Sequence, residues 1–231
     1  FPYTTLFRSR LDSQLQLFIA HGRGQWGTPL SWVLKENPGI KSLSDLPPGF
    51  TLGTGPEFSS TDWFFRQILT LLGKDVVATN ASWIGLHHQF DAQEMNGLAY
   101  AAGVPNPQIK RLFRKSNLRV MGFSPEEMTL IQDKLHLHPY LILENSYQNQ
   151  ITPINSAAFW NYAITQCQVN EDWIYELTRL AIARSSELPR PRRPVLSEES
   201  KTEWIQTGGV PFHPGAIRYF KEQGIDLTAK N

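Results

Sequence analysis

Short apolar runs alternate with amphipathic stretches along most of the chain. The runs have the length of buried strands, and the stretches between them repeat apolar residues at helical spacing. Strands are predicted at residues 15–20, 31–35, 76–82, 98–102, 118–122, 140–143, 151–154 and 156–165. Helices are predicted at residues 87–95, 108–114, 125–135, 171–184, 197–205 and 216–223. This alternation predicts an α/β fold with mostly parallel sheets and helices on both faces.

The stretch from Phe50 to Gly73 combines a strand, a loop broken by glycine and proline, and an amphipathic helix. The loop closes on the hydroxyl residues Ser59, Ser60 and Thr61. Such residues cap the unpaired backbone N–H groups of a helix start. The remaining N–H groups and the helix dipole favour an anion by about 0.3–1 kcal/mol. We predict that this loop binds a carboxylate; the alternative is an ordinary capped helix.

A second loop follows the predicted strand at residues 98–102 and should open on the same sheet edge, where ligands of α/β sheets bind. It offers a phenol and a glycine-lined wall, a combination that suits a small anionic solute. The predicted ligand-binding residues from the two loops are Thr54, Gly55, Ser59, Ser60, Thr61, Tyr100, Gly103 and Pro105.

Composition excludes several other classes of protein. Apolar residues make up 41% of the 231 residues, so a sizeable core can form, and the net charge of +1 gives no electrostatic footprint for nucleic acid. The single cysteine, Cys167, rules out an internal disulfide and a cysteine-built zinc site. No apolar run approaches the roughly 20 residues that span a bilayer. We expect no cofactor.

Candidate metal and catalytic groups are weak. His87 and His88 are adjacent and would point about 100° apart on a helix, so they chelate one ion poorly. His136 and His138 lie near a turn without an acidic third ligand at a recognised spacing. The chain has no G-x-S-x-G elbow. Paired carboxylates such as Glu126-Glu127 fall in predicted first helical turns, where the helix dipole explains them. We therefore expect neither a metal nor a catalytic site.

The first nine residues, FPYTTLFRS, resemble the translation of a sequencing adapter and are excluded from the fold prediction. We expect the natural chain to enter, already truncated, at about Arg10. The missing signal peptide is then uninformative about export.

Four motifs occur in an order that resembles the solute receptors of TRAP transporters, most of all the TAXI family. They are GIKSLSDL from Gly39, FTLGTGPEFSSTDWFFRQILTLLG from Phe50, AYAAGVPNPQI from Ala99 and VPFHPGAIRYFKEQG from Val210. The last motif is the most specific. The resemblance spans residues 15–227, nearly all of the natural chain.

The resemblance implies a monomeric, periplasmic-binding-protein-like receptor, not an enzyme, whose two lobes close over a small carboxylate. The solute would be a dicarboxylate, a 2-oxoacid or an amino acid such as glutamate, delivered to a membrane permease. Residues 48–149 would form the second lobe, and residues 10–47 with 150–231 an incomplete first lobe. The receptor would be periplasmic or extracytoplasmic. The alternatives are an enzyme on the same two-lobed scaffold and a signalling sensor domain.

The chain also departs from the family pattern. Glu57 stands in the ligand loop, where it would repel an anion unless it points away or pairs with a cation. Asn96 stands where an aspartate is common. The opening strand and glycine-rich loop of the family would precede residue 15. His213, in the last motif, is predicted to anchor the last helix.

Overall fold

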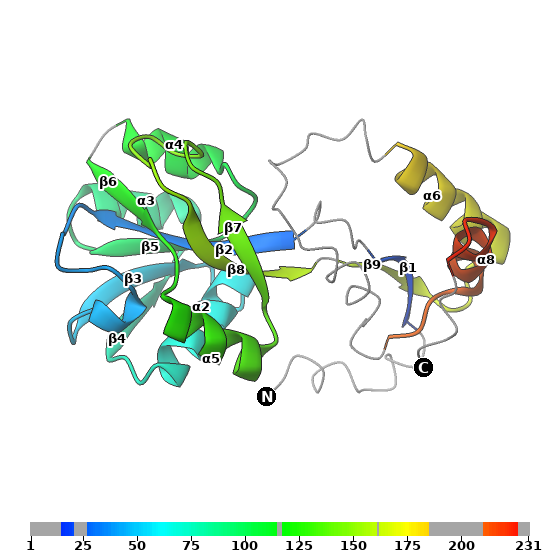
Figure 1. Ribbon diagram of the computed structural model, residues 1–231, viewed down its shortest axis with the longest axis horizontal. Coiled ribbons are helices and arrows are strands. Elements are labelled where there is room, and N and C mark those ends of the chain that lie inside the picture. The colour runs from blue at the N-terminus through cyan, green and yellow to red at the C-terminus, as the bar shows by residue number, and fades with distance from the viewer. Residues whose placement is uncertain (1–14, 21–26, 115–116, 161, 185–209, 226–231) are drawn as a thin grey trace. The chain divides into compact units, whose positions relative to one another are not determined.

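A computed structural model describes residues 15–20, 27–114, 117–160, 162–184 and 210–225 of the chain (Figure 1). The chain divides into two compact units, one of residues 27–159 and one of residues 1–26 with 160–231. We call them the larger and the smaller unit. The predicted leader at residues 1–9 and the predicted helix at 197–205 lie outside the described residues.

The larger unit is built on a 7-stranded sheet with the order β4-β3-β5-β2-β8-β7, and β6 also pairs with β2. The strands are β2 (Gly27–Lys35), β3 (Phe50–Gly55), β4 (Val76–Asn80), β5 (Gly97–Ala101), β6 (Leu118–Met121), β7 (His138–Ile142) and β8 (Ile154–Trp160). β3 pairs in parallel with β4 and β5. β2 pairs antiparallel with β5 and β6, as β7 does with β8. The α/β fold is confirmed, but the sheet is mixed rather than mostly parallel.

Four helices and a short 3-10 turn are described in this unit: η2 (Leu43–Asp45), α2 (Ser60–Leu71), α3 (Trp83–Asp91), α4 (Pro107–Phe113) and α5 (Pro125–Leu135). α3 begins four residues before the predicted start at His87, because Ser82 caps it by accepting from the N–H of Gly85. Ser59 caps α2 and Ser124 caps α5, as the sequence predicts.

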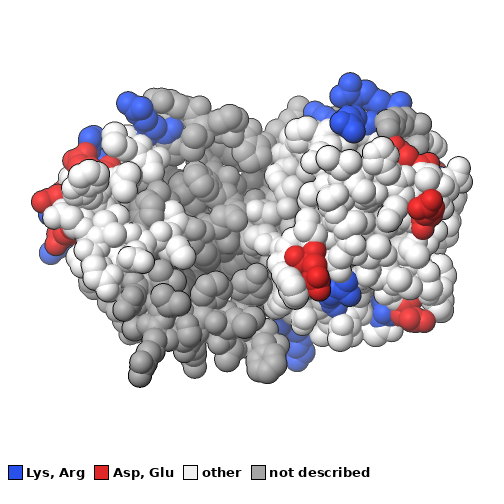
Figure 2. Space-filling view, turned by 180° about the vertical axis from the view of Figure 1, so that it is seen from behind, with Lys and Arg blue, Asp and Glu red and all other residues white. Residues whose placement is uncertain are grey.

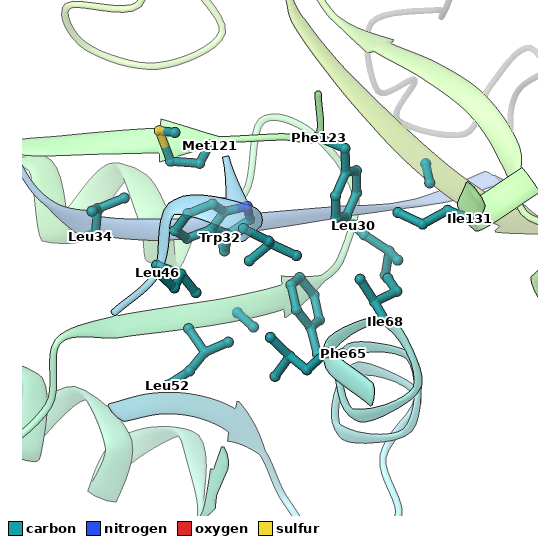
Figure 3. Close-up of a cluster of buried hydrophobic side chains, with 14 of the residues drawn as sticks. Leu30, Trp32, Leu34, Leu46, Leu52, Phe65, Ile68, Met121, Phe123 and Ile131 are labelled. Atoms are coloured by element: carbon teal, nitrogen blue, oxygen red, sulfur yellow. The ribbon is translucent and has the colours of Figure 1, made fainter. Parts of the chain in front are cut away.

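Both faces of the sheet are covered, as β2 shows most directly. Leu30, Trp32 and Leu34 point into one buried cluster, which also holds residues of α2 and α5. Val33 points into the other cluster, with residues of α3 and α4. This alternation is the period of two expected for a strand buried on both faces. Figure 3 shows Phe65 projecting from α2 into the first cluster.

In its described residues, the smaller unit shows a two-stranded antiparallel sheet and a pair of helices. β1 (Leu15–Ala20) pairs with β9 (Tyr162–Gln166), and the helices are α6 (Glu171–Ala183) and α8 (Pro214–Glu222). The predicted strand at 156–165 is therefore divided between β8, which pairs with β7, and β9. The predicted segment at 151–154 is also wrong, because β8 begins only at its last residue.

His213 caps and anchors α8, as predicted. Its Nδ1 accepts from the N–H of Gly215, so Nε2 donates to the carbonyl of Val169, and only 1% of the residue is exposed. The core beside it is formed by Ile174, Phe212, Ala216, Tyr219 and Phe220.

The larger unit is wider than the predicted second lobe. It includes β2 and most of β8, which the sequence analysis assigned to the first lobe, because both strands are hydrogen-bonded within its sheet. The assignment of the units to receptor lobes stays a prediction. None of the helices described here is long and apolar enough to cross a membrane. Acidic and basic side chains both occur on the described surface drawn in Figure 2, most of which carries neither.

Candidate functional site

The start of α2 is tied to the end of β5. β3 ends at Gly55, whose φ of 90° is a left-handed conformation that favours glycine. Ser59 then caps the helix, and its hydroxyl accepts from the N–H of Asp62 at 3.2 Å. The Thr61 hydroxyl oxygen accepts from the N–H of Ala101 at 3.0 Å. The two loops selected from the sequence therefore lie together at one edge of the sheet.

A cavity of about 350 Å³ opens between these loops. It is lined by Pro56, Ser59, Ser60, Thr61, Trp83, Tyr100, Ala101, Ala102, Asn106 and Gln108. Four of the predicted binding residues, Ser59, Ser60, Thr61 and Tyr100, are among them, and no lining residue carries a formal charge. That these residues bind a ligand stays a prediction.

Hydrogen-bond donors are available on the α2 side of the cavity. Within the described parts of the chain, nothing accepts from the backbone N–H of Ser60 or Thr61. The Thr61 oxygen is already an acceptor from Ala101, so its own O–H remains to donate. These donors lie at the positive end of a 12-residue helix. The arrangement favours a small group that carries acceptors and negative charge.

Tyr100 forms part of the cavity wall, and its hydroxyl is paired with His87 rather than free to bind a solute. Only 1% of it is exposed, and its hydroxyl is 2.9 Å from Nε2 of His87. Its ring stacks on Trp83 with centroids 4.9 Å apart and planes 8° apart. Burial, with a smaller effect from Tyr147, raises the pKa of the Tyr100 phenol, which keeps it neutral. Trp83 was not among the predicted residues, although a tryptophan just after a strand end was a visible signal.

Thr54 is fully buried and does not line the cavity. Its hydroxyl donates to the Asp62 carboxylate at 2.7 Å, and Asp62 also accepts from Asn80 and Arg66, each at 2.7 Å. Desolvation raises the pKa of Asp62, but the hydrogen bonds from Asn80, Thr54 and Arg66 outweigh it, so the pKa is lowered. Asp62 was missed in the sequence, although its position three residues after the capping serine could have indicated it.

The other predicted residues lie outside the cavity lining. Gly55 ends β3, Gly103 is exposed and Pro105 is partly buried. Glu57 is exposed and does not line the cavity either, so the acid does not oppose an anion there directly. Asn96 accepts from both the N–H and the hydroxyl of Thr51, an acceptor role that an aspartate could also fill.

The histidines that the sequence offered as metal ligands lie in the described part of the chain. The histidine, cysteine, aspartate and glutamate residues there form no group of three or more that could hold an ion. His87 is paired with Tyr100, and His136 adopts a left-handed conformation as the C-cap of α5.

A family model described as the NMT1-like family matches residues 19–224. No curated protein sequence matches the chain significantly.

Several solved structures are similar in architecture. A periplasmic transporter gives a TM-score of 0.46 at 12% identity, with 94% of this chain and 70% of that chain covered. An ancestral arginine-binding protein bound to arginine gives a TM-score of 0.44 at 9% identity, with 87% of this chain and 67% of that chain covered. Substrate-binding domain 2 of Lactococcus lactis GlnP in its open conformation gives a TM-score of 0.40 at 13% identity, with 76% of this chain and 58% of that chain covered. The chain therefore spans well under two thirds of that last domain, and the similarity does not identify a ligand.

Proposed function

The chain belongs to the NMT1-like family, and we propose that it is the solute-binding part of an extracytoplasmic receptor for a small carboxylate. The receptor would be of the TAXI type and would deliver its solute to the membrane permease of a TRAP-type secondary transporter. Two arguments support the proposal: the order of the four motifs along the sequence, and the chemistry of the cavity at the start of α2.

Of these two arguments, the cavity is the structural observation that carries the proposal. Its volume of about 350 Å³ is at the small end of the range for ligand pockets. Two backbone N–H groups and the Thr61 hydroxyl can meet carboxylate oxygens, and charge-assisted bonds of this kind are stronger than neutral ones. Because the lining carries no cation, recognition would depend on uncharged donors and the helix dipole.

The same lining favours binding over turnover. Tyr100 is neutral and paired, and His87 is bonded to it. The Ser59 hydroxyl caps α2, and no histidine, carboxylate or lysine among the described residues lines the cavity to act as its base. We therefore infer that the solute leaves unchanged. In a two-lobed receptor, a shift from 1:99 to 99:1 in favour of the closed state needs about 5.5 kcal/mol of preference from the solute.

A thermal-shift screen against dicarboxylates, 2-oxoacids and amino acids tests this function. A true solute at about a hundred times its dissociation constant should stabilise the protein by roughly 2.7 kcal/mol. NMR of the recovered solute should show it intact. If no carboxylate binds, the proposal is wrong; if the solute is consumed, the enzyme alternative is correct.

The side-chain hydroxyls at the start of α2 are tested by Ser60→Ala combined with Thr61→Ala, which leaves both backbone N–H groups in place. We expect the affinity for the carboxylate to fall by about tenfold or more, because hydrogen bonds to a charged group are lost. The control pair, Thr70→Ala with Thr129→Ala, also removes two hydroxyls from helices of the same unit but not from the cavity lining. Equal affinity in both double variants would rule out a role for these two hydroxyls in binding the solute.

A further inference from the structure

Asn106 is held in the cavity wall by three hydrogen bonds. It caps α4, and its Oδ1 accepts from the N–H of Gln108 at 2.7 Å and of Ile109 at 3.4 Å. Its own backbone N–H donates to the Tyr147 hydroxyl at 3.0 Å. Only 9% of the residue is exposed. The side chain is therefore fixed in both position and orientation.

The amide nitrogen of this side chain donates no hydrogen bond to the described residues of the fold. Because Oδ1 is occupied by the two N–H groups, the other end of the carboxamide must be Nδ2, which can only donate. No acceptor for Nδ2 occurs among the residues that the structure describes, and Asn106 lines the cavity. A buried donor without a partner is unfavourable, and a bound ligand can supply the missing acceptor.

We propose that Asn106 is a specificity-determining residue whose Nδ2 donates to the solute. The inference rests on the proposed function and names the group that Asn106 meets: a carboxylate or keto oxygen, never an ammonium. The lining supports this choice, since it holds no carboxylate to pair with an ammonium group. The solute would then accept hydrogen bonds from two separate segments, the start of α2 and the cap of α4.

Binding of 2-oxoglutarate, succinate and L-glutamate to the full chain, measured by calorimetry, tests this role. Wild-type protein should bind 2-oxoglutarate at least about tenfold more tightly than glutamate, because the keto oxygen accepts where the ammonium cannot. Asn106→Asp keeps the capping oxygen but replaces the donor with a charged acceptor. The substitution should weaken the binding of 2-oxoglutarate and of succinate by about 10- to 100-fold. It should also shift the ratio of the two affinities, for 2-oxoglutarate and for glutamate, towards glutamate.

The chain contains a matched control for this change. Asn170 caps α6 through the same pattern, with Oδ1 accepting from the N–H groups of Asp172 and Trp173, but it is exposed and lies outside the cavity lining. Asn170→Asp should leave all three affinities unchanged. If Asn106→Asp does not fold, Asn106→Ser keeps a capping hydroxyl and removes the amide, and should weaken the same two acids.

The two proposals fail in different ways. Unchanged affinities in the folded Asn106 variant, or a wild-type protein that binds glutamate as tightly as 2-oxoglutarate, would overturn the role of Asn106 and leave the receptor function standing. If wild-type protein binds none of the three acids nor any other carboxylate of the screen, both proposals are overturned.

Discussion

Asp62 places a buried negative charge next in the chain to Thr61, which lines a cavity that we assign to an anion. The carboxylate is compensated locally, because Arg66 bonds to it at 2.7 Å and also donates to Asn80 and to the carbonyl of Ala78. The guanidinium thus holds the start of α2 to the end of β4. The pair leaves the helix entrance close to neutral apart from its own dipole, so the carboxylate does not cancel the attraction for a solute.

The lowered pKa of Asp62 makes a prediction about acid stability. A group whose pKa is depressed by folding contributes stability above its unfolded pKa, near 3.8, and loses it as the pH falls through the lower folded value. Asp62→Asn should therefore cost about 1–3 kcal/mol at pH 7, since it disrupts a buried network. The difference from wild type in the free energy of unfolding should shrink as the pH falls from about 5 to below 3.8.

Urea titrations of both proteins across that pH range measure the difference. Arg179→Gln is a suitable control for the loss of a charged partner, because Arg179 pairs with Glu176 on the exposed side of α6. A difference between wild type and Asp62→Asn that is the same at pH 6 and pH 3 would contradict the assignment.

At the residue scale, only local contacts could be predicted from the sequence. The cap of α2 by Ser59 depends on residues three positions apart, and a single stretch of sequence reveals it. The partner of Asp62 on β4 is 18 residues away, and the partner of Asn106 is 41 residues away. Such contacts exist only after the sheet has formed, so the place of Asn106 in the cavity wall could not be recognised beforehand.

Glu127 joins two elements that are far apart in the sequence. It accepts from the N–H and hydroxyl of Ser44 in η2 at 2.7 Å and 2.6 Å, and from the N–H of Ser124 at 2.9 Å. It is only 2% exposed. From the sequence, the helix dipole alone accounts for an acid at this position. In the structure, the Glu127 side chain also connects η2 to the start of α5. The dipole argument accounts for an acid at this position but not for its burial.

Glu127→Ala should lower the free energy of unfolding by about 2–3 kcal/mol, because it leaves two donors of Ser44 without their acceptor. Glu126→Ala is the matched control: the same residue type in the same helical turn, but exposed, with a carboxylate that accepts from the hydroxyl of Ser124. It should leave stability nearly unchanged. Equal losses in chemical denaturation of the two variants would show that the dipole, not the link to η2, is what matters.

At the element scale, the pattern of apolar residues predicts which segments are buried but not how they pair. β2 reads as a buried strand, and the alternation of Trp32 and Val33 between two clusters agrees with that. Its antiparallel direction depends on which strands become its neighbours, and periodicity does not encode neighbours. For the same reason the run at 156–165 reads as one strand, although β8 and β9 pair with different partners.

The whole molecule contains separate hydrophobic cores. Among the described residues, the larger unit holds two clusters on the faces of its sheet, and the smaller unit holds one between α6 and α8. Units with their own cores often unfold as separate cooperative transitions. Heat denaturation should therefore give more than one calorimetric transition. A glycine substitution in each unit can show which transition belongs to that unit.

Two glycines are close-packed in the same way, one in each unit. A Cβ at Gly122 would overlap the carbonyl oxygen of Asn155, and one at Gly215 would overlap that of Glu171. We expect Gly122→Ala to lower the transition temperature of the larger unit only, and Gly215→Ala that of the smaller unit only. Each substitution should reduce the free energy of unfolding of its unit by about 1–3 kcal/mol. Gly85→Ala is the control, since its nearest contact would be an ordinary 3.4 Å and alanine favours the helix.

Differential scanning calorimetry of the three variants decides between independent and coupled units. A single transition that both close-packed variants lower equally would show that the units unfold together, so that the separate cores do not act as separate cooperative units. If the transitions are distinct, adding the solute should raise at least that of the larger unit, because every residue lining the cavity lies between 56 and 108. A solute that raised the other transition alone would place its site outside this cavity.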